Sequence, residues 1–172
     1  MFSISALAPK KWLNKIISIR HEDHEPLKVD EICSAVIHLS SRKEGALIVI
    51  QRSSDLTLHL QGSTKLNSDI FGPLIEATFH KDNSMHDGGM YIAIGRIRAV
   101  RCVLPVTQRN DIPAELGMRH RAALGLAEKT DALIIVVSEE TGLISIAMDG
   151  ELHRGIATND LQDIVEKELK PN

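Results

Sequence analysis

The sequence predicts a single α/β domain in which a central mixed β-sheet is flanked by helices on both faces. Two continuous apolar segments, at residues 46–50 and 132–137, have the composition of strands buried on both sides. Segments with helical spacing of apolar residues separate the predicted strands. The return from residue 137 to residue 143 is short, so these two strands must pair antiparallel. Together these observations predict helices packed on a mixed sheet.

The first predicted elements are a helix and two strands. The helix begins at Asp30, a good N-cap residue, and its apolar positions repeat until Gly45. The apolar strand at 46–50 follows, and it should be central. Leucines alternate with polar residues over 56–60, which predicts a half-buried strand before a turn at Gly62.

A second helix is expected next. Ser68 or Asp69 would cap it, Pro73 would lie in its first turn, and it would end near His80. The residues predicted to form its buried stripe are Ile70, Phe71, Leu74, Ile75, Thr78 and Phe79.

The segments 90–94 and 97–104 predict two strands joined at Gly95 and Arg96. Three arginines interrupt the apolar positions and are interpreted as solvated edges: Arg96, Arg98 and Arg101.

The last third of the chain predicts a helix, a strand pair and a final helix. Small inward residues over 119–129 indicate a closely packed helix. The strand at 132–137 should pair with 143–148. Thr158 would cap the last helix, and Pro171 would stop it.

Composition and charge limit the classes of function. The 172 residues have the length of one domain, and the net charge of −3 excludes a global basic surface, so no nucleic-acid partner is expected. Two distant cysteines, Cys33 and Cys102, indicate neither a disulfide framework nor a zinc site. Apolar runs fall far short of the ~20 residues that span a bilayer, and a secretory signal is not expected. A reducing, cytoplasmic location fits best.

Residues 1–28 are predicted to be an N-terminal helix and connector, with the domain itself at 29–172. Within 10–20, apolar residues share one helical face beside basic ones. This helix could pack on its own domain or could be an interfacial anchor. Membrane contact is expected only if the helix is interfacial, or if the sequence was trimmed from a longer natural chain.

Three polar segments lie where a predicted strand or helix ends. The first is His86-Asp87-Gly88-Gly89, before a strand. Its glycines permit close approach of a ligand, and Asp87 offers a carboxylate to a metal or to a hydroxyl proton. An Asp-Gly pair taken alone is also typical of a plain turn.

The second segment, 117–121, opens a helix, where free backbone N–H groups and the helix dipole favour an anion. Arginines are mildly unfavourable there, which indicates a compensating anion, although a solvated first turn is the simpler alternative.

The third segment, 138–142, follows a buried strand and is either a set of crevice ligands or a hairpin turn. Phosphate donors combined with carboxylates for a divalent cation are typical of a nucleotide site. The sequence lacks a P-loop, a dinucleotide fingerprint and a nucleophile elbow.

In their order along the chain, these motifs resemble the diadenylate cyclase domain family, which makes cyclic di-AMP. The resemblance covers roughly residues 29–169. It rests on His86-Asp-Gly-Gly89, Cys102-Val-Leu-Pro105, Leu116-Gly-Met-Arg-His-Arg-Ala-Ala-Leu-Gly125, Thr130-Asp-Ala132 and Val136-Val-Ser-Glu-Glu-Thr-Gly142, and on the first core strand at 46–50.

The resemblance implies one ATP per domain. Asp87 would lie by the ribose 3′-hydroxyl and a metal, Gly88 and Gly89 would line the nucleotide, and Leu104 would border the adenine. The residues implied for the triphosphate are Arg119, His120, Arg121 and Ser138. Those implied as ligands of Mg²⁺ or Mn²⁺ are His86, Asp87, Glu139 and Glu140. The chain departs from the family pattern twice, because Gly89 replaces Ala and Met118 replaces a Thr whose hydroxyl would aid phosphate binding.

The implied activity is the condensation of two ATP molecules into cyclic di-AMP, with release of two pyrophosphates. A homodimer would bring the two domains face to face, alone or within a larger homo-oligomer. The alternative is a catalytically weak module of the same fold that binds ATP or cyclic di-AMP and regulates a partner. Met118 and Gly89 motivate this alternative, whereas Asp87 and the Arg-His-Arg triplet favour the enzyme.

Overall fold

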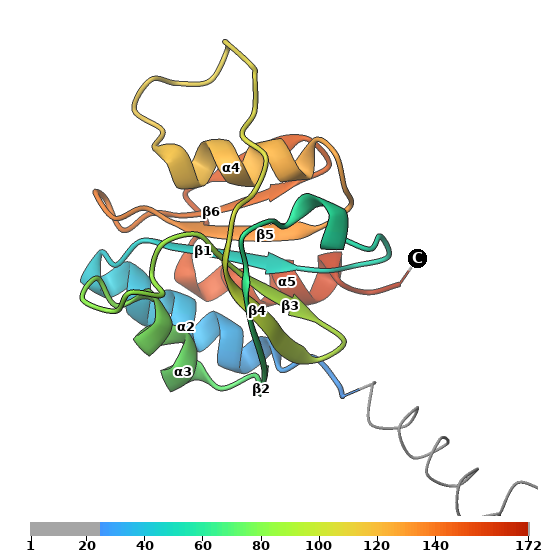
Figure 1. The fold of residues 1–172 in the computed structure, drawn as a ribbon. Coiled ribbons are helices and arrows are strands. Elements are labelled where there is room, and N and C mark those ends of the chain that lie inside the picture. The colour runs from blue at the N-terminus through green and yellow to red at the C-terminus, as the bar shows by residue number, and fades with distance from the viewer. Residues whose placement is uncertain (1–24, 172) are drawn as a thin grey trace, which may run out of the picture.

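The computed structural model describes residues 25–171, in which seven strands form one sheet of order β2-β4-β3-β1-β5-β6-β7 (Figure 1). Within this part of the chain, β1 and β3 are parallel and every other neighbouring pair is antiparallel, so the predicted mixed sheet is confirmed. The strands are β1 (Ala46–Ile50), β2 (Thr64–Asp69), β3 (Gly89–Ala93), β4 (Arg96–Cys102), β5 (Leu133–Val137), β6 (Ile144–Met148) and β7 (Glu151–Arg154).

Helices cover both faces of the sheet, as predicted. Helices α2 (Val29–Arg42), α3 (Gly72–Phe79) and α5 (Thr158–Glu168) lie on one face, and α4 (Met118–Ala127) lies on the other (Figure 1). Each face has its own buried cluster. Ile48 of β1 packs with the first group of helices, and its neighbour Val49 packs with α4. The central strands are therefore apolar throughout, because both of their faces are buried.

The prediction of a strand at 56–60 is wrong, because this segment forms a short 3₁₀ helix, η1 (Thr57–His59). The carboxylate of Asp55 accepts the N–H of Thr57 at 2.9 Å and starts the turn. A strand would place the three leucines on one face. The turn instead buries Leu56 and leaves Leu58 87% exposed.

Two edge strands, β2 and β7, were not predicted from the sequence. Both are largely exposed and pair along one side only, β2 with β4 and β7 with β6, so neither needs a run of apolar residues. Because both strands are polar, they show no hydrophobic periodicity from which a strand could be predicted.

Helix α3 begins later than predicted, and neither Ser68 nor Asp69 caps it, because both belong to β2. The N–H of Gly72 instead donates to Oε2 of Glu31, on α2, at 2.7 Å. Phe71, predicted to be buried, is 53% exposed at the N-cap position. The position of Pro73 in the first turn and the end of the helix at His80 are confirmed.

The helix predicted over 10–20 lies outside the described residues. At the start of the described chain, Glu25 lies against the turn between β3 and β4, with its Oε1 3.7 Å from Nη1 of Arg96. Among residues 25–171, no helix combines the length and the apolar character needed to cross a membrane.

Gly125 shows how closely α4 approaches the segment after β4. A Cβ atom at Gly125 would overlap the carbonyl oxygen of Pro105 and lie 2.7 Å from the backbone nitrogen of Thr107. Gly125, which was not among the residues predicted to face inward, therefore permits this close approach.

We expect Gly125→Ala to lower the free energy of unfolding by about 1–3 kcal/mol, because the new methyl group overpacks the contact. Helix propensity alone would raise stability by about 1 kcal/mol. Gly117→Ala adds the same methyl group where a Cβ meets nothing within 4 Å, so it should cost only the N-cap preference of glycine over alanine. Urea denaturation checks both variants, and a stabilised Gly125→Ala protein would contradict the close approach.

Candidate functional site

The strand directions bring three distant segments to one edge of the sheet. Strand β1 is parallel to β3 and antiparallel to β5, so the start of β1 lies between the start of β3 and the end of β5. The Asp87-Gly88 turn precedes β3, and Ser138 follows β5. The site therefore lies at the amino ends of the parallel pair, opposite to the usual crevice at the carboxyl ends of α/β sheets.

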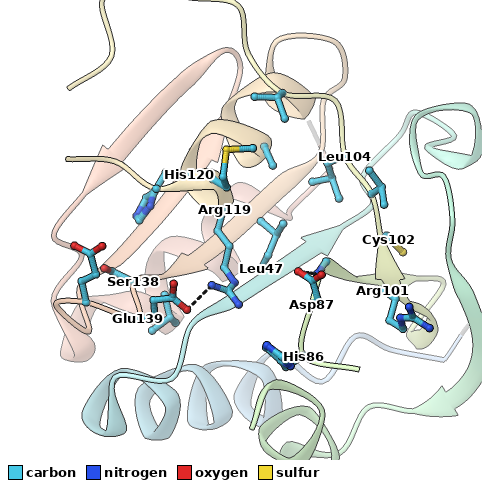
Figure 2. Close-up of a pocket in the computed structure, with 18 of the residues that line it drawn as sticks. Leu47, His86, Asp87, Arg101, Cys102, Leu104, Arg119, His120, Ser138 and Glu139 are labelled. Carbon is cyan, nitrogen blue, oxygen red and sulfur yellow. Dashed lines mark hydrogen bonds and ion pairs between the residues drawn. The ribbon is translucent and has the colours of Figure 1, made fainter. Parts of the chain in front are cut away.

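A pocket of about 590 Å³ opens over this edge on the α4 face (Figure 2). Its volume is within the range of small-molecule sites. The structure brings ten of the twelve predicted site residues into the lining, namely His86, Asp87, Gly88, Leu104, Met118, Arg119, His120, Ser138, Glu139 and Glu140. Gly89 and Arg121 are not among the lining residues.

The Asp87-Gly88 turn packs closely against β4. Gly88 has a φ of +82°, and a Cβ atom there would lie 2.8 Å from the carbonyl carbon of Arg101 and 2.9 Å from the oxygen of Cys102. This position therefore requires glycine. The turn leaves Asp87 exposed at the pocket, where its Oδ1 accepts the N–H of Gly88 at 3.1 Å.

Asn83 organises the loop that carries His86. Its side-chain amide donates to the oxygen of Ala77 at 2.9 Å, and its Oδ1 accepts the N–H of Met85 at 2.9 Å. The ring nitrogen Nδ1 of His86 lies 2.7 Å from the carbonyl oxygen of Asn83. A carbonyl can only accept, so Nδ1 carries the proton and Nε2 keeps the free lone pair that a metal requires.

Gly89 lies behind the lining, at the buried start of β3. A Cβ atom there would be 3.1 Å from Cδ1 of Leu104 and 3.5 Å from Leu47. Both neighbours are side-chain ends that can shift. The replacement of the usual Ala by Gly89 is thus a small change in packing beside Leu104.

Arg119 crosses from the start of α4 toward the end of β5. Its Nη1 donates to Oε2 of Glu139 at 2.9 Å (Figure 2). Its path passes directly over Gly45, where a Cβ atom would lie 2.7 Å from Nη1. Its Nε is buried and has no hydrogen-bond partner among residues 25–171. An unpaired buried donor is unusual, and it would gain a partner if a ligand or water bound beside it.

The other two members of the triplet point to different surroundings. His120 lines the pocket and is 7% exposed. Burial, followed by the charges of Arg154 and Arg119, lowers the pKa of His120. Arg121 instead donates from Nε to the carbonyl oxygen of Leu116 at 3.1 Å, so it braces the loop before α4.

The segment 138–142 is a turn that also lines the pocket. Oγ of Ser138 accepts the N–H of Thr141 at 3.2 Å, and the N–H of Gly142 donates to the Ser138 oxygen at 2.9 Å. Glu139 pairs with Arg119, whereas Glu140 is exposed. The segment is therefore a hairpin turn whose first three residues line the pocket, and their role as ligands stays a prediction.

The pocket also contains residues that sequence reasoning did not select. Arg101 was interpreted as a solvated edge and lines the pocket, as do Leu47, Val103, Val106 and Glu115. Val103 and Met118 are apolar lining residues that are 60% and 65% exposed. Val103 follows β4 and fits an apolar strand pattern. Its exposure depends on how β4 pairs, so the sequence alone contained no signal that Val103 belongs to the pocket.

The family model described as DisA bacterial checkpoint controller nucleotide-binding matches residues 33–152. The chain therefore belongs to this family, the DAC family of nucleotide-binding domains, and its predicted membership is confirmed.

Curated relatives carry names that agree with this family. The chain is 47% identical over 122 residues to diadenylate cyclase CdaS of Bacillus thuringiensis, covering 71% of this chain and 61% of the relative. It is 35% identical over 151 residues to cyclic di-AMP synthase CdaA of Bacillus subtilis, covering 88% of this chain and 55% of the relative. The chain thus spans a little over half the length of these relatives.

Solved structures support the same fold. DacA from Staphylococcus aureus matches with a TM-score of 0.80 at 33% identity, covering 83% of this chain and 95% of that one. A Bacillus cereus structure, described as a hypothetical membrane spanning protein, matches with a TM-score of 0.73 at 44% identity, covering 74% of this chain and 63% of that one.

The lowered pKa of His120 predicts a pH-dependent stability. The unfolded chain, with a histidine pKa of about 6.5, binds this proton more readily than the folded protein. The stability linked to neutral His120 is therefore present above that value and is lost as the pH falls toward the folded pKa.

Between about pH 7.5 and pH 5.5, the wild-type protein should lose more unfolding free energy than His120→Gln, which cannot titrate there. Urea denaturation at both pH values measures this difference. The same loss in both proteins would show that His120 is not the group responsible.

Proposed function

We propose that this chain is a diadenylate cyclase, which condenses two ATP molecules into cyclic di-AMP and releases two pyrophosphates. The observation that carries the proposal is the meeting of the Asp87 turn and the Arg119 end of α4 in one pocket. The carboxylate of Asp87 can interact with a ribose hydroxyl group, and the donors at the start of α4 can bind phosphate. The volume of the pocket between them is suited to one nucleotide. The names of the relatives are consistent with this chemistry.

The nucleotide would lie across the pocket from Leu104 to the start of α4. Leu47 and Leu104 offer an apolar surface to the adenine. The triphosphate would meet the free backbone N–H groups of α4, which has no side-chain cap, together with the buried Nε of Arg119. His120, neutral at pH 7, can donate one ring N–H.

Among the described residues, no group of three or more His, Cys, Asp or Glu side chains is arranged to hold a metal ion. The donors present suit a Mg²⁺ or Mn²⁺ ion that takes its remaining ligands from phosphate and water. His86, through Nε2, and Asp87 would hold it on one side of the pocket, with Glu139 and Glu140 available on the other. Such an ion supplies charge neutralisation at the phosphates and favours the attacking alkoxide.

The reaction requires the 3′-oxygen of one ATP to attack the α-phosphorus of the other. The 3′-hydroxyl loses its proton to Asp87 or to water, a bond from the 3′-oxygen to phosphorus forms, the bond from the α-phosphorus to the bridging oxygen breaks, and pyrophosphate leaves. The same exchange with the two nucleotides in reversed roles closes the ring and releases the second pyrophosphate. Asp87 would organise the 3′-oxygen, either directly or through its metal, and the pocket would contribute positioning and charge stabilisation.

A single pocket of this size holds one nucleotide, so the second would come from a facing copy of the chain. Two apolar residues of the lining, Val103 and Met118, have largely exposed side chains that a facing copy could cover. We expect this homodimer to be the reactive species, whether or not larger homo-oligomers form.

One observation favours the alternative of a catalytically weak module that binds ATP or cyclic di-AMP. Met118, at the phosphate end of the pocket, carries no hydroxyl where the family pattern has Thr. The retained Asp87 turn favours the enzyme. Incubation of the protein with ATP and Mn²⁺, followed by mass spectrometry for cyclic di-AMP, separates the two.

In that assay, Asp87→Asn should lower the rate of product formation by more than about a hundredfold, because it removes a charge that acts at the reacting oxygen. Asp82→Asn is the matched control, since Asp82 is an exposed carboxylate of the same loop outside the pocket lining. Circular dichroism checks that both variants are folded. Wild-type turnover by Asp87→Asn would remove Asp87 from the mechanism.

The face-to-face reaction predicts a dependence on enzyme concentration. Where most of the protein is monomeric, the initial rate should approach the square of the protein concentration, and it should become linear once dimers predominate. Initial rates and light scattering over the same concentration series test this. A linear rate from a species that stays monomeric would rule out a dimeric reaction.

A further inference from the structure

Arg101 occupies an irregular position in β4. Gly89 pairs with Cys102, but Tyr91 pairs with Ala99, so β4 has one residue more than β3 between these two pairs. This is a β-bulge, and Arg101 within it has a φ of +59°. Bulges change the direction of a side chain, and a non-glycine residue in this region of φ is unusual. Here the redirected side chain lines the pocket.

The three arginines of β4 have different surroundings. Arg96 donates to Oδ1 of Asp69 at 2.7 Å, and Nη1 of Arg98 lies 3.5 Å from Oδ1 of Asn67. The side chain of Arg101 is exposed and makes no hydrogen bond or ion pair with any residue in 25–171. The first two arginines stabilise the sheet edge, whereas Arg101 has no such role.

The other charged side chains described in the pocket lining either form ion pairs or are carboxylates. Arg119 pairs with Glu139, and Glu115 pairs with Arg154 at 3.3 Å. Asp87 and Glu140 add two further negative charges. Among the described lining residues, Arg101 is thus the guanidinium without a carboxylate partner. A polyanion that enters this pocket would find its uncommitted positive charge there.

The backbone of Arg101 also contacts the turn that carries Asp87. The Cβ position of Gly88 lies 2.8 Å from the carbonyl carbon of Arg101, so the turn and the bulge are held together. In the view of Figure 2, Arg119 and Arg101 are drawn on opposite sides of Asp87. Arg101 and Arg119 both line the pocket with Asp87, so a phosphate group bound near Asp87 has two guanidinium groups in the same cavity.

We propose that Arg101 is a further nucleotide-contacting residue, which binds a phosphate group on the Asp87 side of the pocket. The inference rests on the proposed function. The phosphate group could belong to the ATP in the same domain or to the ATP of the facing domain, which must approach Asp87 for the reaction. Both sources present the same chemistry, an anionic phosphoryl oxygen that accepts from a guanidinium.

The test compares the wild-type chain of residues 1–172 with Arg101→Ala, Arg101→Lys and the matched control Arg98→Ala, which alters the same strand outside the pocket. Calorimetry measures the affinity for 3′-deoxyATP, which cannot condense because it lacks the attacking hydroxyl, and for adenosine, which lacks phosphate. The rate of cyclic di-AMP formation is measured in parallel. A structural defect would affect adenosine and 3′-deoxyATP alike.

If Arg101 binds the phosphate of its own domain's ATP, Arg101→Ala weakens 3′-deoxyATP binding at least about tenfold and leaves adenosine binding nearly unchanged. If it binds the facing nucleotide, 3′-deoxyATP binding stays near wild type while cyclic di-AMP formation falls at least about tenfold. Arg101→Lys, which keeps the charge, should lie between Arg101→Ala and wild type in either case.

Behaviour of Arg101→Ala identical to that of Arg98→Ala would overturn the proposal, as would equal losses for 3′-deoxyATP and adenosine. If the wild-type chain binds 3′-deoxyATP but forms no cyclic di-AMP, the proposed function fails, and binding alone then decides the role of Arg101. In that case, unchanged affinity in Arg101→Ala overturns this inference as well.

Discussion

The pairing of β1 with a parallel neighbour on one side and an antiparallel neighbour on the other is the constraint on which the site depends. It aligns Ala46 with Val137 and Ile48 with Met90. Segments about fifty residues apart in the chain, 86–89 and 138–140, are thereby brought to flank the start of the same strand. A sheet in which β5 ran parallel to β1 would place the two segments at opposite ends. The catalytic proposal therefore depends on strand direction before it depends on any side chain.

The second requirement is that α4 begins above this edge of the sheet. Gly125 allows the helix to lie directly on the segment after β4, and the N–H of Thr107 donates to the oxygen of Arg121 at 3.1 Å. The chain that passes Leu104 is thus attached to the helix that presents Arg119. One contact thereby fixes the distance between the expected adenine end and the expected phosphate end of the pocket.

Much of this arrangement could be predicted from the sequence, because apolar runs specify buried strands and the motifs specify a family. The errors have physical reasons. The strand β2 is polar because it lies at an exposed edge, and Leu58 repeats an alternation that a turn happens to share. Arg101 could not be identified, because a bulge depends on the register between two strands and leaves no periodic trace in either. Arg121 shares a motif with Arg119, but its position on the helix directs it to Leu116.

Gly45 leaves the space through which the guanidinium of Arg119 passes, and this has a consequence for sequence variation. An alanine at this position adds one methyl group, outside the polar motifs of the pocket, and is a conservative change in composition. It would nevertheless require the guanidinium of Arg119 to shift, and it would also touch Cβ of Glu139, the partner of that arginine. In a survey of natural or random variants, Gly45 should therefore behave like a residue of the site, although its own atoms offer a ligand no chemical group. Sensitivity of Gly45 to substitution would then reflect the space that the side chain of Arg119 requires.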